Sequence, residues 1–98
     1  METTDTTERL HDLILQAPGQ LIATRIRRAR RQAGMSHDRL GEALGGVTRQ
    51  HLIKLEKGKH RPRPETLLRI ADALGKPVEY FLVAEAGEPN PFPEDAAA

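Results

Sequence analysis

Glycines divide this sequence into short segments, and this limits what the chain can fold into more than any other feature. Gly34, the pair Gly45-Gly46, Gly58 and Gly75 each follow a stretch in which apolar residues recur at helical spacing. Glycine readily takes the left-handed conformation in which helices end. No segment alternates in the manner of a strand, so we predict an all-α fold. The expected helices span residues 20–33, 36–44, 48–57, 64–74 and a short last one that starts at Pro77.

The starts of these helices carry their own signals. Ser36 and Thr48 are residues whose side-chain oxygens accept hydrogen bonds from the free amides of a first turn. Pro64 suits a first helical position, where its missing N–H is not needed. The apolar faces that follow are Ile22, Ile26, Ala29 and Ala33, then Leu40, Ala43 and Leu44, and then Leu67, Ile70, Ala71 and Leu74.

Both ends of the chain differ from its centre. In residues 1–19 we expect a short helix, capped by Asp5 or Thr6 and ended by Pro18-Gly19. Its apolar side could be core or could serve dimerisation, and the sequence leaves this open. Residues 84–98 are rich in Ala, Gly, Pro and acidic residues, which predicts a disordered acidic tail. The apolar side of the first helix consists of Leu10, Leu13, Ile14 and Ala17.

The charge is concentrated in the middle of the chain. Residues 20–83 hold 14 Lys and Arg against six Asp and Glu, whereas residues 1–19 and 84–98 are both net acidic and the chain totals +1. A basic centre suits a polyanionic partner, but a solvated basic face would give the same count. The chain has no cysteine, which excludes disulfides, and no apolar run near the length of a membrane span, so we expect a cytoplasmic protein without a membrane partner.

Residues 36–44 and 48–57, joined by a glycine turn, have the layout of a helix-turn-helix. On a helical wheel Leu52 and Leu55 of the second helix point to one side. The other side holds Arg49, Gln50, Ile53, Lys54 and Lys57. Arg and Lys can pair with guanine, Gln with adenine, and an apolar group with the thymine methyl. An ordinary amphipathic helix would show the same division.

The order of motifs along the chain favours a DNA-reading helix over an ordinary amphipathic helix. Residues 21–82 resemble the Cro/C1-type (lambdoid phage repressor, XRE-like) helix-turn-helix family. The resemblance implies a compact five-helix lambda-repressor-like domain in residues 20–83, with the N-terminal helix of residues 1–19 as an addition. The matching pieces are Ile26-Arg27, Arg30 with Gly34-Met35-Ser36, Val47-Thr48-Arg49-Gln50, Leu52, Leu55-Glu56-Lys57-Gly58-Lys59, Pro62-x-Pro64-Glu65-Thr66-Leu67 and Ile70-Ala71-x2-Leu74-Gly75.

The resemblance also implies roles for individual residues. The positions that read bases in this family are matched by Arg49, Gln50 and Lys54. Ile53 is added as a base contact because it lies on the same side of the helical wheel. Arg30 and Glu56 match a structural pair that ties the first helix of the domain to the recognition helix. The expected phosphate contacts are His37, Thr48, Lys57, Lys59, His60 and Arg61.

The turn between the two helices departs from the family. One glycine is usual there, whereas this chain has Gly45 and Gly46, and Gly41 replaces the usual alanine at the helix contact. The extra residue either lengthens the first helix or loosens the turn. Either change would alter the angle at which residues 48–57 meet the groove.

These features predict a sequence-specific DNA-binding transcriptional regulator, a nucleoid-associated repressor that binds a palindromic operator as a homodimer. The dimer contact is expected from the last helix, through Tyr80, Leu82 and Val83, or from the N-terminal helix. An antitoxin that binds its own promoter and a toxin is the main alternative, and a protein-interaction module without DNA binding is another. We expect no enzyme activity and no cofactor, because the sequence shows no nucleophile motif, paired-carboxylate pattern or phosphate loop. No metal is expected either, since His11, His37, His51 and His60 lack metal-ligand spacing. His51, at the edge of the buried face, is assigned to packing or to a phosphate.

Overall fold

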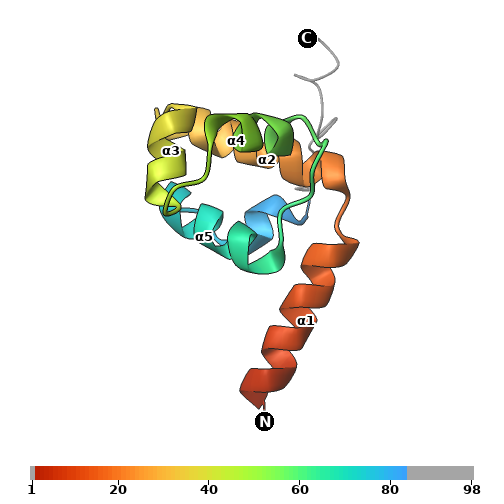
Figure 1. The fold of residues 1–98 in the computed structure, drawn as a ribbon. Coiled ribbons are helices and arrows are strands. Elements are labelled where there is room, and N and C mark those ends of the chain that lie inside the picture. Colours follow the sequence, from red (N-terminus) through yellow and green to blue (C-terminus); the bar gives the residue numbers. More distant parts are fainter. Residues whose placement is uncertain (1, 84–98) are drawn as a thin grey trace.

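The computed structural model describes residues 2–83, and these residues form helices without any strand (Figure 1). The predicted all-α fold is confirmed, with the last expected helix reduced to a single 3₁₀ turn. No helix in this part of the chain is both long and apolar enough to cross a bilayer. The tail predicted for residues 84–98 lies outside the described residues. The elements are α1 (Glu2–Gln16), α2 (Gly19–Gln32), α3 (His37–Ala43), α4 (Arg49–Glu56), α5 (Pro64–Leu74) and the 3₁₀ turn η1 (Val78–Phe81).

The predicted caps of α3, α4 and α5 are confirmed. The Ser36 hydroxyl accepts a hydrogen bond from the Arg39 N–H at 3.0 Å, and the Thr48 hydroxyl accepts one from the His51 N–H at 3.2 Å. Gly75 ends α5 with φ at 70°, and the next amide reaches back to the Ala71 carbonyl at 3.0 Å. These bonds satisfy terminal backbone groups that the helices themselves leave free.

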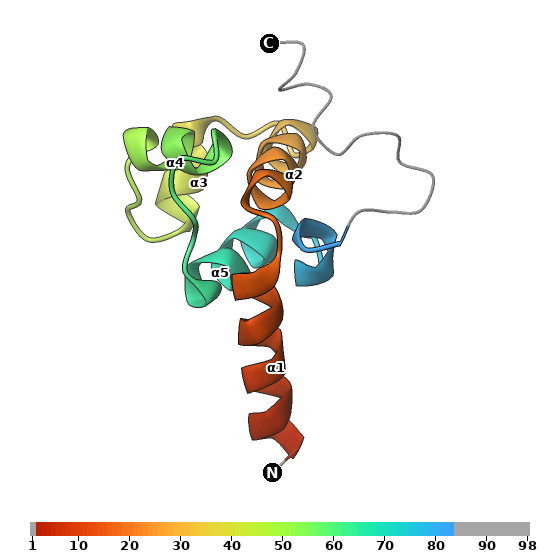
Figure 2. The ribbon, with the colours of Figure 1, turned by 90° about the vertical axis from the view of Figure 1, so that its right-hand side faces the viewer.

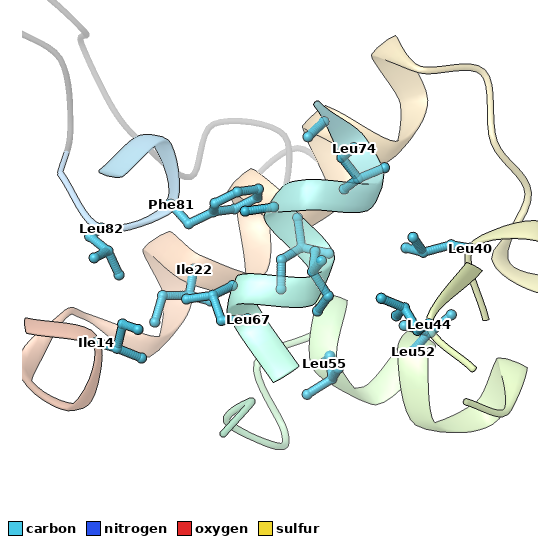
Figure 3. Packing of buried hydrophobic residues seen from close by; sticks show 14 of the residues in the cluster. Ile14, Ile22, Leu40, Leu44, Leu52, Leu55, Leu67, Leu74, Phe81 and Leu82 are labelled. Atoms are coloured by element: carbon cyan, nitrogen blue, oxygen red, sulfur yellow. The ribbon is translucent and has the colours of Figure 1, made fainter. Parts of the chain in front are cut away.

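The core lies where α2 and α5 meet the other elements (Figure 3). Ile22, Leu67 and Phe81 are fully buried, and Leu52 and Leu55 of α4 reach into the same cluster. Ala33, predicted on the apolar side of α2, is exposed because it is the residue at which that helix ends. Leu82, predicted at a dimer contact, is 8% exposed and belongs to the core.

Helix α1 projects from the rest of the molecule in both views (Figures 1 and 2). It begins at Glu2, so Asp5 and Thr6 lie inside the helix and the prediction that either caps it is wrong. Its C-terminal half is anchored: Leu10 packs against the core, and Ile14 and the following Ala17 are buried. Helix α1 also contacts α5. Leu13, predicted on the same apolar side, is 50% exposed.

The turn between α3 and α4 holds the extra glycine without lengthening α3, which ends at Ala43. Gly45 and Gly46 have φ values of 89° and 111°, a region that favours glycine. The turn is not loose, because the amides of Gly46 and Val47 both donate to the Gly41 carbonyl, at 2.9 and 3.1 Å. The additional residue is therefore absorbed in a hydrogen-bonded turn.

Candidate nucleic-acid interface

Helix α4 is held from one side only. Leu52 and Leu55 are buried among residues of the core, while Arg49, Gln50 and Lys54 are exposed. Ile53 is half-buried, and Lys57, just past the helix, is exposed. The burial pattern agrees with the helical wheel. The side chains expected to read bases therefore share the free side of α4.

The buried pair of Arg30 and Glu56 fixes α4 against α2. The Arg30 guanidinium donates to both carboxylate oxygens of Glu56, from Nε at 2.6 Å and from Nη2 at 3.1 Å. Nη1 of Arg30 donates to the Met35 carbonyl at 2.9 Å, so one side chain holds two elements and the turn after α2. A bidentate ion pair of this kind sets the relative orientation of the two side chains as well as the distance between them. The pair that the family resemblance implied is confirmed.

His37 joins this pair. Its Nε2 lies 3.1 Å from Oε1 of Glu56, with the side chain mostly buried. The residue was expected at a phosphate, and only Nδ1 of its ring is left for such a contact. Together Arg30, His37 and Glu56 line a groove of about 260 Å³ between α2 and α4, whose other lining residues are Arg27, Arg31, Ile53 and Lys57.

Arg49 at the start of α4 is paired with Asp38 of α3. Its Nη2 and Nε lie 2.5 and 3.1 Å from the two carboxylate oxygens, and both side chains are more than half exposed. The hydrogen bond from Arg49 lowers the pKa of Asp38, and the same bond raises the pKa of Arg49. An exposed pair of this kind contributes little to stability, so Arg49 can exchange this partner for another acceptor at small cost. Sequence reasoning missed Asp38, although its position in the first turn of α3 was visible.

The segment after α4 is a basic loop, residues 59–63. Lys59 and His60 are exposed, as is His51 of α4, which was predicted at the edge of the buried face. The rings of His51 and His60 stack with centroids 6.0 Å apart. Arg61, expected at a phosphate, instead directs Nη2 to carbonyl oxygens at the C-terminal end of α1.

The exposed basic surface is smaller than the charge count suggests. Arg25 is 1% exposed, donates to the Tyr80 carbonyl at 2.9 Å and lies over the Tyr80 ring, with its central carbon 4.9 Å from the ring centroid. Arg30 is buried as well. At about 100° per residue both arginines lie at the edges of the apolar stripe formed by Ile22, Ile26 and Ala29, whereas the other arginines of residues 20–33 lie on the opposite side of the helix. This position in the pattern was a signal of their burial. The exposed cations of residues 20–83 are Arg31, Arg39, Arg49, Lys54, Lys57, Lys59, Arg61, Arg63 and Arg69.

A helix-turn-helix family model matches residues 26–81, more than half of the chain and all of α3, α4 and α5. The chain belongs to the Cro/C1-type helix-turn-helix family. Members of this family are DNA-binding transcriptional regulators. The match covers the helix-turn-helix and its supporting helices and leaves out α1.

Relatives with this helix-turn-helix domain occur in bacteria and archaea. A protein of Methanothermobacter thermautotrophicus is 41% identical over 68 residues, which are 67% of this chain and 97% of the relative. One of Sinorhizobium medicae is 39% identical over 67 residues, 68% of this chain and 48% of the relative, so the chain spans about half of that protein's length. Another, y4dJ of Sinorhizobium fredii, is 36% identical over 73 residues, 74% of this chain and 91% of the relative. Each is named an uncharacterized HTH-type transcriptional regulator. No solved structure gives a significant match.

Proposed function

We propose that this chain is a sequence-specific repressor that binds a pseudo-palindromic DNA operator as a homodimer, with residues 20–83 as its DNA-binding domain. The observation that carries the proposal is the free side of α4. Arg49, Gln50 and Lys54 are exposed together on a helix whose opposite side is anchored by Leu52 and Leu55. A short helix held in this way can enter the major groove without losing its packing.

The chemistry of the free side fits base edges. Arg49 and Lys54 donate to the guanine acceptors, and the amide of Gln50 can both donate to and accept from adenine. Ile53 is half-buried and lies between them on the same side, where it suits a thymine methyl. Arg49 binds DNA after it leaves Asp38, whose carboxylate would otherwise lie close to the phosphates.

The phosphate contacts are proposed for the residues that flank α4. Thr48, Lys57, Lys59 and His60 are exposed around its two ends. His37 contributes through Nδ1, since its Nε2 is engaged with Glu56. Contacts of this kind release counterions from DNA, so affinity falls steeply as salt rises.

The homodimer is proposed to form through the end of α1 and the two residues after η1, Leu82 and Val83. Leu13 and Val83 are 50% and 62% exposed and line one groove of about 270 Å³ together with Leu82. Two copies paired here would each present α4, and a symmetric dimer reads half-sites about one helical turn, roughly 34 Å, apart.

Selection of bound sequences from a random duplex library tests the proposal with the full chain. We expect a symmetric motif with half-sites one turn apart. Gln50→Ala and Lys54→Ala should each relax one base preference, at about 1–3 kcal/mol per contact, while the exposed Arg69→Ala on α5 serves as a matched control that leaves the motif unchanged. The proposal is contradicted if the unmodified protein selects no motif, or if both α4 variants select the same motif as the unmodified protein.

Salt dependence supplies an independent measurement. Lys59→Ala should weaken binding to all sequences about equally and reduce the slope of log affinity against log salt by about 1. Arg69→Ala should leave that slope unchanged. If Lys59→Ala and Arg69→Ala give equal slopes of log affinity against log salt, Lys59 does not contact a phosphate.

A further inference from the structure

The C-terminal end of α1 is held by a side chain that lies more than 40 residues away in the sequence. Nη2 of Arg61 donates to the carbonyls of Ile14 at 2.9 Å and Leu15 at 2.8 Å, and also to that of Ala17. The Ile14 and Leu15 carbonyls are among the last four of α1, which have no partner within the helix. Arg61 therefore supplies the C-terminal cap of α1.

Helix α1 relies on this outside donor because the residues at its end supply a backbone amide to the Leu13 carbonyl, from Ala17, but none to the carbonyls of Ile14 and Leu15. No basic residue lies in its last turn, and Pro18, which follows, has no backbone N–H to give. A guanidinium at the negative end of a helix is favourable in charge as well as in hydrogen bonding. Helices α2 to α5 are instead each followed within two residues by a glycine of positive φ, and the local backbone amides there donate back to the last turn.

A second contact joins the same two parts of the chain. The side chain of Gln20 lies close to Gly58. A Cβ added at Gly58 would lie 2.9 Å from Nε2 and Oε1 of the Gln20 side-chain amide. A Cβ at Gly19 would lie 3.3 Å from Nη1 of Arg61. The α1–α2 junction thus rests against the end of α4 and the basic loop at two points.

We propose that Arg61 is a positioning residue that couples α1 to DNA binding. It fixes the basic loop, in which Lys59 and His60 face DNA, against the end of α1, so that binding DNA also orders α1. The inference rests on the proposed function for its DNA-facing part. Helix α1 lies outside the family match of residues 26–81 and becomes, through this link, a part of the DNA-binding apparatus.

Amide hydrogen exchange of the full-length protein tests the link without DNA. Arg61→Ala should speed exchange of the Ala17 amide, which donates to Leu13 at the end of α1, by about fivefold or more, as expected for the loss of hydrogen bonds to a charged group. Arg63→Ala is the matched control, since it removes an exposed arginine two residues away and should leave that amide unchanged. Equal exchange in the two variants would overturn the cap.

DNA binding by a variant of unchanged charge tests the coupling. In Gly19→Leu the new Cβ would lie 3.3 Å from Nη1 of Arg61. The rest of the leucine side chain has to fit beside it, so we expect the guanidinium to be displaced. We expect about fivefold weaker operator binding with an unchanged salt slope, together with loss of the slowing of α1 exchange that DNA causes in the unmodified protein.

Two outcomes separate this inference from the proposed function. If the unmodified protein binds its operator but α1 exchange is the same with and without DNA, the coupling is wrong and the proposed function stands. If the unmodified protein binds no DNA at low salt, the proposed function fails, and the coupling to DNA fails with it, while the cap is still judged from the free protein. A salt slope lowered by about 1 in Arg61→Ala, with Ala17 exchange unaffected, would make Arg61 a phosphate contact instead.

Discussion

At the scale of single residues, Gly41 makes the closest backbone contact of the helix-turn-helix. A Cβ on this residue would lie 2.1 Å from the Val47 carbonyl oxygen, a distance that no real contact allows. The contact exists because the longer turn folds back over α3 and bonds to the Gly41 carbonyl. We therefore expect the second glycine of the turn and the missing side chain at position 41 to depend on each other.

Gly41→Ala should consequently lower the free energy of unfolding by about 1–3 kcal/mol, as overpacking does, and should weaken operator binding by shifting the turn before α4. Chemical denaturation and gel shifts measure the two effects. Glu42→Ala, an exposed change at the next position, should alter stability by less than about 0.5 kcal/mol. An unchanged midpoint in Gly41→Ala would show that the turn can move freely.

If Arg49 reads bases as proposed, its ion pair with Asp38 should limit how readily it reaches DNA. Asp38→Asn removes the ion pair and a negative charge beside the expected phosphates, so operator affinity should rise about twofold to fivefold at low salt. Asp72→Asn, on the exposed side of α5, is the matched control and should change affinity less. Weaker binding by Asp38→Asn would mean that the pair orients Arg49 for base contact.

The pH dependence of this pair has a definite sign. Because the hydrogen bond from Arg49 lowers the pKa of Asp38 in the folded protein, the pair is intact at neutral pH. Its contribution to stability is present above the ordinary aspartate pKa and is lost as pH falls through the lowered folded value. Acidification between pH 7 and pH 5 should therefore not release Arg49, which NMR titration of the Asp38 carboxyl can check.

At the scale of elements, the orientation of α4 depends on one buried ion pair. Arg30 from α2 and Glu56 from α4 meet through two hydrogen bonds, and His37 from α3 meets the same carboxylate. Removing one partner leaves a buried charge without compensation. Three helices are joined at this carboxylate, so a change there affects all three.

Glu56→Ala should lower the free energy of unfolding by about 3 kcal/mol or more, since the buried guanidinium of Arg30 is left unpaired. Denaturant unfolding measures this loss, and Glu65→Ala, an exposed glutamate on α5, provides the comparison. If Glu56→Ala costs no more than Glu65→Ala, the pair does not hold α4.

At the scale of the whole molecule, the charges and apolar residues left on the surface define different regions. Arg49, Lys54, Lys57 and Lys59 lie in or just after α4 and are exposed. Within residues 8–83, the large exposed apolar side chains are Leu13 and Leu15 of α1 and Val83 after η1. Leu13 and Val83 line one groove, and Leu15 does not. Separate regions allow one copy to bind DNA while it contacts another copy.

Leu13→Asp should therefore raise the dimer dissociation constant about tenfold or more, because a charge replaces an apolar contact in the groove. Leu15→Asp makes the same chemical change on the same helix outside the groove and should leave dimerisation intact. Sedimentation equilibrium distinguishes the two variants. Equal effects, or a protein that is monomeric without any change, would rule out this dimer contact.

Local sequence patterns were enough to predict α2 to α5 with their caps and ends, because these depend on neighbours a few residues apart. The start of α1 and the 3₁₀ turn η1 were not predicted correctly. Glycine positions, the Ser36 and Thr48 caps and the apolar spacing of α4 and α5 all act locally, and the family pattern added the Arg30–Glu56 pair. Errors arose where the pattern alone cannot tell burial from exposure, as at Leu13, Ala33 and Leu82.

The other contacts between long side chains depend on the tertiary arrangement of the helices. Arg49 binds Asp38, His37 binds Glu56, and Arg61 binds the end of α1. The partners in each pair are too far apart in the sequence for a local pattern to predict the contact. A guanidinium or imidazole on a flexible stem can serve a phosphate or an internal acceptor equally well. The fold chooses between them through distances, because it brings carboxylates and uncapped carbonyls within reach.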